Sequence, residues 1–454
     1  MSDQLPQVCI IGAGSSGLPA VKALLDAGIP FDCFEKSSCV GGLWVYDNPN
    51  GLSGAYRGLN SNAPKGLMQY SEYPLPRRYP GYPSHWDFAE YFHDYAEHFG
   101  LLPHITFNTT VEHVEQLADD SMEVTLSDGS RRRYDCVLVA NGHHWSPRWP
   151  EPAFPGTFGG TQMHSHSYRT AAIADGKRVV VVGMGNSAMD IASEVSLLAE
   201  RTYLSARTGV PIVPKYFFGR PAPVWVFRLF SFGLGQRLLD AASRLMEGRP
   251  EDFGLPKPIC RVGQTHPSGS DQLFTALRRG RVQAKPNLAE LRGDSVRFVD
   301  ETIEKVDLII YCTGYKIEFP FFDPNYISAP NNEIGLFKQV FDPDHPRVFF
   351  VGLCQPLGSI QPLAELQSRW IAEYLTGRYA LPDPKKMRQE IAADRQWRAK
   401  RFVKSPRNTI EIDHFQYTRA VRAEIRAGRR RASGRLPVTA VAGTEAIRVR
   451  DSAG

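Results

Sequence analysis

The order of apolar and polar positions near the start of the chain predicts a strand, a helix and a second strand. Residues 8–11 are Val-Cys-Ile-Ile, an unbroken apolar run typical of a strand buried on both faces. Residues 18–27 carry leucine and valine at helical spacing, and the apolar run 30–34 ends in Glu35. The pattern therefore predicts the beginning of a parallel α/β sheet.

A glycine-rich turn lies between the first strand and the helix. Residues 12–17 are Gly-Ala-Gly-Ser-Ser-Gly, a G-x-G-x-x-G pattern. Gly12 allows the tight turn, Gly14 lets the backbone approach a pyrophosphate, and Gly17 lets helix and strand pack closely. The helix N-terminus offers N–H groups to an anion. Glu35, 18 residues after Gly17, is placed to accept hydrogen bonds from a ribose diol. The unit therefore predicts a dinucleotide-binding site.

The same design recurs some 170 residues later. A predicted strand at 178–182 is followed by Gly-Met-Gly-Asn-Ser-Ala at 183–188, a G-x-G-x-x-A pattern. A predicted helix at 189–198 and a strand at 202–206 come next. This second unit predicts a second dinucleotide-binding site.

The end of that last strand predicts which nicotinamide cofactor binds. The strand ends in Arg207 and Thr208 rather than in an acid. An acid there selects a free 2′-hydroxyl, whereas an arginine and a hydroxyl favour a 2′-phosphate. We therefore expect NADPH to be preferred over NADH. The alternative is that Arg207 is only a solvated loop cation.

Two dinucleotide turns in one chain indicate a flavoprotein with separate FAD and nicotinamide sites. The acid–apolar–glycine runs at 134–142 and 307–315 look like the strands that return the chain between nested domains. A disulfide reductase would need a redox cysteine pair beyond Glu35. Cys33 precedes that residue and Cys39 has no partner at the required spacing, so this class is excluded.

Composition and charge narrow the remaining classes. The chain has 454 residues, of which 42% are hydrophobic and 22% charged, a globular profile that excludes disorder throughout. The net charge is +5, but seven arginines and one glutamate at 419–436 contribute +6, so the rest sums to −1. A nucleic-acid-binding tail is the alternative that this charge raises. Because the body is near neutral, we expect no nucleic-acid partner.

Targeting signals and cysteine usage predict a cytoplasmic protein. No secretory signal precedes the first strand, and the most apolar stretch, 222–239, is interrupted by Arg228 and Arg237. Cysteines within apolar runs are expected to be buried reduced thiols: Cys9, Cys33, Cys136 and Cys312. No cysteine–histidine spacing typical of zinc occurs, so we expect no metal.

The region between the two glycine turns carries the most specific motif. Residues 158–168 fit F-x-G-x-x-x-H-x-x-x-Y, with His164 and Tyr168 at the last two positions. The motif resembles the identifying motif of the flavin-containing monooxygenases. Related Baeyer–Villiger monooxygenases carry tryptophan at the position of Tyr168, which argues against that group.

Further segments resemble the same family in the same order. They are GGLW at 41–44, NSNAPK at 60–65, LSARTG at 204–209, CTGY at 312–315 and QPLAELQSRW at 361–370. The resemblance spans residues 7 to about 380. The insert 210–265 and the arginine-rich tail match no motif of the family.

We predict an α/β fold of two nested Rossmann-like dinucleotide-binding domains with three-layer parallel sheets, followed by C-terminal helices. The FAD domain is expected at 1–168 and 300–385, and the NADPH domain at 169–299 with the insert 210–265. Residues 386–454 are expected to form a helical segment and a basic tail that is disordered after Gly428.

The resemblance also implies the reaction. NADPH reduces FAD, O2 forms a C4a-hydroperoxyflavin, and an amine nitrogen or sulfide sulfur takes one oxygen atom while the other leaves as water. The bound NADP⁺ shields the peroxide, and the protein mainly excludes solvent. A Baeyer–Villiger monooxygenase acting on ketones and an uncoupled NADPH oxidase are the alternatives.

The resemblance implies the site residues as well. Asn62 is the expected catalytic residue, its amide bonding the peroxyflavin and the nicotinamide region; the alternative is an Asx-type turn before Pro64. The residues expected to bind FAD are Gly12, Gly14, Ser16, Gly17, Glu35, Lys36, Gly42, Leu43, Trp44, Asn62, Val111 and Gln361. Those expected to bind NADP are Asn60, Ser61, Tyr168, Gly183, Gly185, Asn186, Ser187, Ala188, Arg207 and Thr208. His164 and His166 are expected to order the linker or domain interface rather than to act as bases.

The insert carries a second pattern at helical spacing. An apolar set shares one side of a predicted helix: Leu234, Leu238, Ala241, Ala242 and Leu245. We expect this side to pack as a core face or active-site cover; a membrane-surface or partner-binding patch is the alternative. The protein is expected to form a homodimer, and weak contact with a membrane surface is compatible with the pattern.

Overall fold

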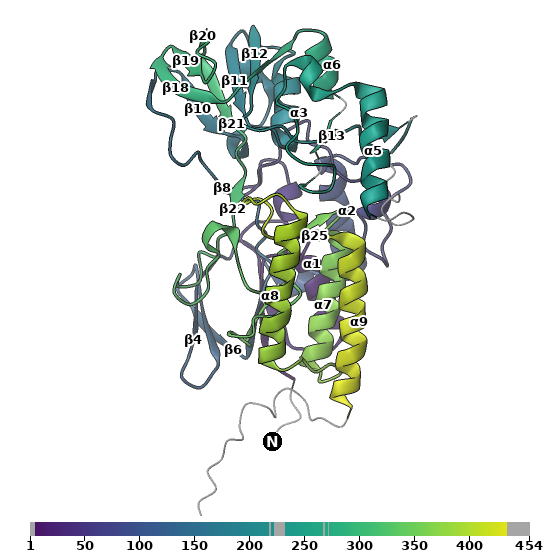
Figure 1. Cartoon of the computed structure of the whole chain (residues 1–454). Coiled ribbons are helices and arrows are strands. Elements are labelled where there is room, and N and C mark those ends of the chain that lie inside the picture. The colour runs from purple at the N-terminus through teal and green to yellow at the C-terminus, as the bar shows by residue number, and fades with distance from the viewer. Residues whose placement is uncertain (1–4, 218, 222–231, 267, 271, 434–454) are drawn as a thin grey trace, which may run out of the picture.

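Two parallel β-sheets, one in each lobe of the molecule, form the framework of the fold (Figure 1). The computed structural model describes residues 5–217, 219–221, 232–266, 268–270 and 272–433. Each sheet is covered on both faces by apolar side chains from other elements. The predicted α/β fold with two Rossmann-like parallel sheets is thereby confirmed.

The lower lobe of Figure 1 is built on five parallel strands in the order β23-β7-β1-β2-β3. These strands are Val8–Ile11 (β1), Phe31–Phe34 (β2), Ile105–Thr106 (β3), Cys136–Val139 (β7) and Val348–Phe350 (β23). Val8 and Ile10 face a core formed mainly by helices, namely α1 (Gly17–Asp26), α2 (His85–His98) and α7 (Gln361–Leu375). Cys9 and Ile11 face an antiparallel sheet of β4 (Val111–Gln116), β5 (Met122–Leu126) and β6 (Arg131–Tyr134). Burial on both faces explains why β1 is apolar at every position.

The upper lobe repeats this three-layer design with strands in the order β10-β21-β11-β12-β17. They are Thr161–His164 (β10), Arg178–Val182 (β11), Arg201–Ser205 (β12), Val282–Lys285 (β17) and Leu308–Tyr311 (β21). One face packs on α3 (Asn186–Val195) and α6 (Gln272–Arg278). The other packs on a sheet of β9 (Gly156–Phe158), β18 (Leu288–Gly293), β19 (Ser295–Phe298) and β20 (Ile303–Lys305).

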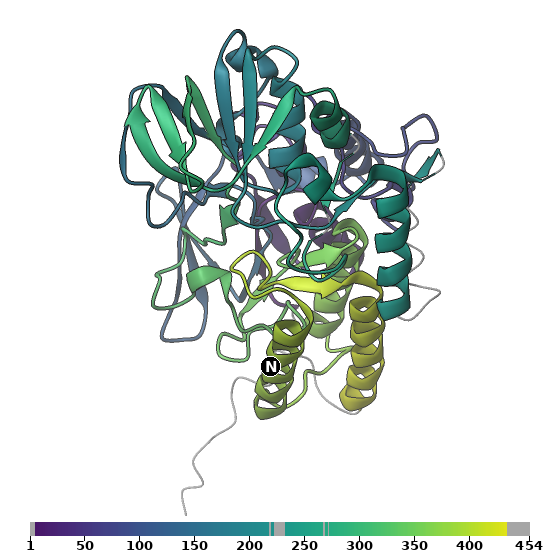
Figure 2. The same ribbon diagram turned by 45° about the horizontal axis from the view of Figure 1, so that its top comes forward.

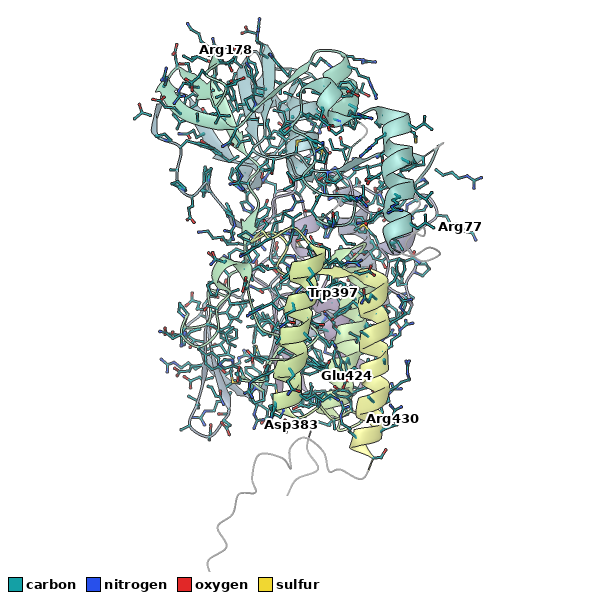
Figure 3. The ribbon with its side chains drawn as sticks, in the orientation of Figure 1. Arg77, Arg178, Asp383, Trp397, Glu424 and Arg430 are labelled. Atoms are coloured by element: carbon teal, nitrogen blue, oxygen red, sulfur yellow. The ribbon has the colours of Figure 1, made fainter. Side chains whose placement is uncertain are left out.

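A paired arginine holds the outer end of the upper sheet. Arg178, labelled at the tip of the upper lobe in Figure 3, donates to both carboxylate oxygens of Asp307, at 2.7 and 2.9 Å. These hydrogen bonds hold the pKa of Asp307 at about 2, below its ordinary value. The pair joins the first residue of β11 to the residue before β21, and so fixes the register of the two central strands.

The strand pairing does not follow the predicted domain boundaries at residues 168 and 300. β10 and β21 both belong to the upper sheet, although they lie in the segments predicted for the FAD domain. β10 (TQMH) has no apolar run, and the apolar run of β21 does not show which of two similar sheets it joins, so long-range pairing decides it. The chain crosses between the lobes near β8 (Ser146–Pro147) and β22 (Tyr315–Lys316), which pair with each other.

The C-terminal helices belong to the core of the lower lobe. α8 (Pro384–Arg401) and α9 (His414–Ala432) lie beside α7 (Figures 1 and 2). α9 buries Tyr417, Val421 and Ile425 in that core. The helix continues past Gly428 to Ala432, so the predicted disorder is wrong for these residues; the tail from 434 onward lies outside the described residues.

Two arginines of α9 form ion pairs with glutamates of the same chain. Arg429 pairs with Glu373 of α7, and Arg431 pairs with Glu424, which Figure 3 shows on α9 together with Arg430. The short strand β25 (Glu411–Asp413) pairs with β24 (Gln355–Leu357), which ties the start of α9 to the lower lobe. Part of the local positive charge is therefore used to attach the helix.

The insert forms a small subdomain of the upper lobe, and its helix contradicts one prediction. Its elements are β13 (Ile212–Val213), β14 (Tyr216–Phe217), β15 (Arg220–Pro221), α5 (Phe232–Glu247) and β16 (Ser268–Gly269). Leu234, Leu238 and Leu245 were expected to be a core face, but they are 45%, 44% and 84% exposed. The helix instead buries Leu239 against Val213, because a second apolar stripe at the same spacing faces the lobe. Among the described residues, no helix is long and apolar enough to cross a membrane.

Candidate cofactor sites and active site

The first glycine turn joins β1 to α1. Gly12 has a φ of +97°, and its N–H donates to the carbonyl oxygen of Phe34 at 2.9 Å. A Cβ on Gly17 would lie 1.9 Å from the Gly12 oxygen, so a side chain there would push the helix away from the strand. Both positions therefore require glycine for the turn itself.

A second turn closes over the first without side chains between them. A Cβ on Gly42 would lie 3.2 Å from the Cα of Gly14, so the two backbones approach each other closely. The Asn48 side chain donates to the Gly42 carbonyl oxygen at 3.1 Å and holds this second turn in place. The bare backbone of the two turns forms a cradle that fits a pyrophosphate.

Glu35 lies at the end of β2 with both carboxylate oxygens directed at the backbone. It accepts from the N–H of Ala13 at 2.7 Å and from the N–H of Ser37 at 2.8 Å. Burial raises the pKa of Glu35 above its ordinary value, although these two hydrogen bonds oppose the rise. Each carboxylate oxygen retains a lone pair for a ribose hydroxyl. The geometry is therefore compatible with the predicted role of Glu35, which is to accept hydrogen bonds from the ribose of FAD.

Replacing Glu35 with glutamine should weaken FAD binding without unfolding the protein. An amide nitrogen cannot accept the N–H of Ala13 or Ser37, and the neutral side chain binds a diol less strongly. We expect a loss of about 1–2 kcal/mol, or roughly 5–30-fold in FAD affinity, measured by the fluorescence of released FAD. Asp32→Asn, on the same strand but paired with Tyr134, is the matched control. Equal FAD affinity in the two variants would contradict the assignment.

The other residues predicted to bind FAD from this part of the chain differ in exposure. Leu43 and Trp44 lie in a 3₁₀ turn, and the Trp44 ring centroid is 4.4 Å from that of Phe88 in α2. Lys36 is exposed directly after β2, and Val111 is buried at the start of β4. Their contact with FAD stays a prediction.

The N-terminus of α7 meets the first glycine turn. A Cβ on Gly352 would lie 2.0 Å from the hydroxyl oxygen of Ser16, so the segment after β23 packs directly on that turn. Gln361 is fully buried; its carbonyl oxygen accepts from Ser359, while its Nε2 has no partner among the described residues. An unpaired buried donor costs about 1–3 kcal/mol, so this atom fits an acceptor on bound FAD.

The second glycine turn joins β11 to α3. Gly183 has a φ of +135°, and a Cβ there would lie 2.5 Å from the carbonyl oxygen of Cys312. Gly185 is the residue before the helix, and Ala188 is fully buried, as the third small residue of the pattern requires. The half-buried Ser187 lies in the first turn of α3, where its N–H can reach an anion.

Asn186 ties this turn to the insert. Its side-chain oxygen accepts from the N–H of Gly269 at 2.9 Å. Gly269 belongs to β16, which pairs in parallel with β13. The insert is therefore attached to the beginning of α3, which the sequence did not indicate.

Arg207 and Thr208 are exposed just beyond the carboxyl end of β12. This strand is the neighbour of β11, and the N–H of Gly183 donates to Ser205 at its end, at 2.9 Å. Within the described part of the chain, the Arg207 guanidinium makes neither a hydrogen bond nor an ion pair. A free cation at this place fits the 2′-phosphate of NADPH.

The residues of the motif between the two glycine turns have structural roles, and the structure corrects the prediction made for one of them. A Cβ on Gly160 would lie 2.5 Å from the Asp307 oxygen, so β10 requires glycine there to approach β21. Tyr168 was expected to contact NADP, but it is fully buried and its hydroxyl donates to Glu194 of α3 at 2.7 Å. The prediction is wrong for this side chain, because the helix covers it.

The histidines of the motif lie in the linker between the lobes. His164 accepts from the N–H of His166 at 3.1 Å, and His166 contacts the Gly51 oxygen at 3.1 Å. Arg169 donates to the Ser53 oxygen at 3.1 Å and so joins the same loop. Burial lowers the pKa of His164 to about 4, so it is neutral at pH 7. The expected role in ordering the linker agrees with these contacts.

The loop 60–62 brings the expected catalytic residue to the seam between the lobes. Asn60 donates to the Gly58 oxygen at 3.0 Å, and the buried Ser61 hydroxyl donates to the Ala63 oxygen at 3.0 Å. Asn62 is exposed, and its amide makes no hydrogen bond to any described residue. The alternative of an Asx-type turn before Pro64 is therefore wrong.

A cavity of about 100 Å³ opens beside Asn62. Three parts of the chain that are distant in sequence form its wall. The first gives Asn62, Ala63, Pro64, Leu67 and Tyr82. The insert and the residues directly after it give Val213, Pro214, Lys215, Val262, Gly263, His266 and Gly269, and the C-terminal part gives Leu357, Gly358, Asp413, His414 and Phe415. Most of these side chains are apolar. The sequence missed the insert and C-terminal residues, since no motif links these segments.

The residues present fit both cofactors. The first turn, Glu35 and the unpaired Gln361 amide form one set in the lower lobe. The second turn and the free Arg207 form the other set in the upper lobe. Asn62 and the cavity lie where the two lobes meet.

Comparison with known proteins gives one family. The model of the Flavin-binding monooxygenase-like family matches residues 6–430. Flavin-containing monooxygenase 5 of Cavia porcellus is 37% identical over 432 residues, which cover 90% of this chain and 81% of that protein. The structure of S-allyl-L-cysteine S-oxygenase from Allium sativum has a TM-score of 0.70 at 26% identity, covering 94% of this chain and 91% of the other. An open crystal structure of cyclohexanone monooxygenase, with a TM-score of 0.71, 18% identity and coverage of 94% and 99%, shares the fold.

Proposed function

The chain belongs to the Flavin-binding monooxygenase-like family, and from this premise we propose that oxygen transfer takes place at Asn62, in the cavity between the lobes. The protein is an FAD- and NADPH-dependent monooxygenase of soft nucleophiles. When bound, FAD accepts a hydride from NADPH and delivers one atom of O2 to the substrate, the other atom leaving as water.

The two lobes divide the cofactors between them. The lower lobe would hold FAD through the two bare glycine turns, Glu35 and Gln361. The upper lobe would hold NADPH through the second turn, Arg207 and Thr208. We retain the predicted division into an FAD domain and an inserted NADPH domain, with β9, β10, β20 and β21 assigned to the NADPH domain. Hydride transfer then requires the two lobes to hold both rings at the seam.

The observation that carries the assignment of the active site is the unpaired Asn62 amide at the cavity. Its N–H groups are free to donate to the activated oxygen and to the bound nicotinamide cofactor. The apolar wall of the cavity excludes water, which protects the oxygen until a substrate arrives. A sulfide or an amine with small apolar substituents suits a cavity of about 100 Å³.

The titratable groups near the seam agree with a reaction that needs no general base. Burial lowers the pKa of His164 to about 4, and burial also lowers the pKa of His166. Both imidazoles are therefore mainly neutral at pH 7, and His166 is engaged with the Gly51 oxygen. Their contacts support a role in holding the linker.

Product analysis tests the assignment against the alternatives. With NADPH and O2, the enzyme should convert a simple sulfide to its sulfoxide with product equal to most of the NADPH consumed. A simple ketone offered under the same conditions should yield little ester, since Tyr168 replaces the tryptophan of the related ketone oxygenases. Ester as the main product would favour the Baeyer–Villiger alternative. Hydrogen peroxide equal to all NADPH consumed would favour an oxidase.

We propose that the protein is a cytoplasmic homodimer. Light scattering of the purified protein measures its oligomeric state. Weak contact with a membrane surface is proposed for α5, because its exposed leucines 234, 238 and 245 lie on one side beside Arg237 and Arg244. Co-sedimentation with anionic vesicles measures that contact, and Leu238→Asp should reduce it.

A further inference from the structure

One stretch of the C-terminal part, residues 403–413, connects the two lobes and is called the seam segment below. Figure 2 shows it between the lobes, after the end of α8 that carries Trp397 in Figure 3. On the upper side, the N–H of Val403 donates to the Gln264 oxygen at 2.9 Å. On the lower side, the Thr409 hydroxyl donates to the Asn332 oxygen at 2.6 Å. The seam segment is thus fastened to both lobes.

The seam segment aims one arginine at the second glycine turn. A Cβ built on Gly185 would lie 3.3 Å from Nη1 of Arg407, 3.6 Å from Nη2 and 3.7 Å from Cζ. The two terminal nitrogens of the guanidinium therefore face the residue that precedes α3. Protein surrounds Arg407, yet part of its surface stays accessible, so the side chain lines an internal space.

The Arg407 guanidinium has no hydrogen-bond acceptor among the residues that the structure describes. Within the described part of the chain, its guanidinium makes neither a hydrogen bond nor an ion pair within 4 Å. Burial lowers the pKa of Arg407, and the buried carboxylate of Glu411 only partly opposes this from beyond contact distance. Burial holds the pKa of the neighbouring His144 well below its ordinary value, so this imidazole is neutral and gives Arg407 no counter-charge.

The surroundings therefore place two positive groups together. The N-terminus of α3 carries unpaired N–H groups and a partial positive charge. The Arg407 guanidinium lies beside it and lacks a counter-charge in contact. A buried unpaired charge is costly, so the arrangement is favourable when an anion lies between the two groups.

We infer that Arg407 binds the pyrophosphate of the nicotinamide dinucleotide from the side opposite to the glycine turn. The inference rests on the proposed function, since it takes the second turn as the NADPH site. The seam segment then becomes part of that site, although its first residue, Val403, follows Tyr311 at the end of β21 by 403 − 311 = 92 residues. Binding of the dinucleotide would also hold the upper lobe against the C-terminal part of the lower one. Arg407 and Arg207 would divide the ligand, one contacting the pyrophosphate and the other the 2′-phosphate.

The test uses the FAD-loaded enzyme and NADP⁺ as the probe. Isothermal titration calorimetry of Arg407→Gln should show NADP⁺ bound about 10- to 30-fold more weakly than in the wild type. Arg407→Lys, which keeps the charge but not the planar fork, should lie between them. Lys404→Gln is the matched control, because Lys404 is an exposed cation of the same segment. Retained FAD absorbance and an unchanged melting temperature show that the variants are folded.

A second readout identifies the phosphate. Because both NADPH and NADH contain a pyrophosphate, Arg407→Gln should raise the two KM values by the same factor. Unchanged NADP⁺ affinity, a selective loss of FAD, or a selective rise in the KM for NADPH alone would each overturn the inference. If the wild-type enzyme fails to bind NADP⁺ at all, the proposed function fails instead, and the two failures are thereby distinguished.

Discussion

Asn62→Ala should turn the enzyme into one that consumes NADPH and O2 but releases hydrogen peroxide in place of product. The Asn62 amide is unpaired and faces the cavity between the lobes. Removing a donor that stabilises developing charge costs about 2.7–4 kcal/mol, so sulfoxide formation should fall roughly 100- to 1,000-fold. FAD content should not change, because the glycine cradle, Glu35 and Gln361 are untouched.

The measurement compares NADPH consumed, peroxide released and sulfoxide formed in one assay. Asn62→Asp separates donation from size, since the carboxylate keeps the shape of the side chain but cannot donate. It should behave like the alanine variant. Asn325→Ala, on an exposed loop of the lower lobe, is the control and should remain coupled. Coupling in Asn62→Ala equal to that of the wild type would remove Asn62 from the mechanism.

Arg207→Ala should raise the KM for NADPH far more than the KM for NADH. The guanidinium is free at the end of β12, next to the second glycine turn. Losing two charge-assisted hydrogen bonds to a phosphate costs about 2–4 kcal/mol, or roughly 30- to 1,000-fold in KM. NADH has no 2′-phosphate, so its KM should move little.

Steady-state kinetics with each cofactor checks this result. Arg201→Ala is the matched control, since Arg201 is exposed on the same strand at the end remote from the turn. Equal rises in both KM values for Arg207→Ala would place Arg207 elsewhere than at the 2′-phosphate. If both KM values rise equally and only slightly, the result would favour the alternative that Arg207 is a solvated loop cation.

The sequence predicted the two glycine turns because local chemistry determines them. The turn at Gly12 and the contact at Gly17 need glycine whatever the rest of the chain does. The strands that precede the turns carry four consecutive apolar residues each, at 8–11 and 179–182, because each is buried on both faces. Such features depend on near neighbours in the chain, and so they can be recognised from a single sequence.

The predictions from the sequence were wrong where one pattern of residues is compatible with two ways of packing. The leucine stripe of α5 has helical spacing, but so has the stripe around Leu239 that is buried. Tyr168 lies in a motif between two cofactor sites, yet α3 covers its side chain and its hydroxyl donates a hydrogen bond to Glu194. Periodicity identifies the faces of a helix, and only the packing of other elements decides which face is buried.

By itself, the sequence determined that this protein has two dinucleotide turns, a linker motif between them and an arginine suited to a 2′-phosphate. Each of these is written in a short run of neighbouring residues. Only the tertiary structure decided that the cavity beside Asn62 has walls from the insert and the C-terminal part, and that Arg407 faces Gly185. These contacts join segments separated by up to several hundred residues, and their geometry depends on how whole lobes pack.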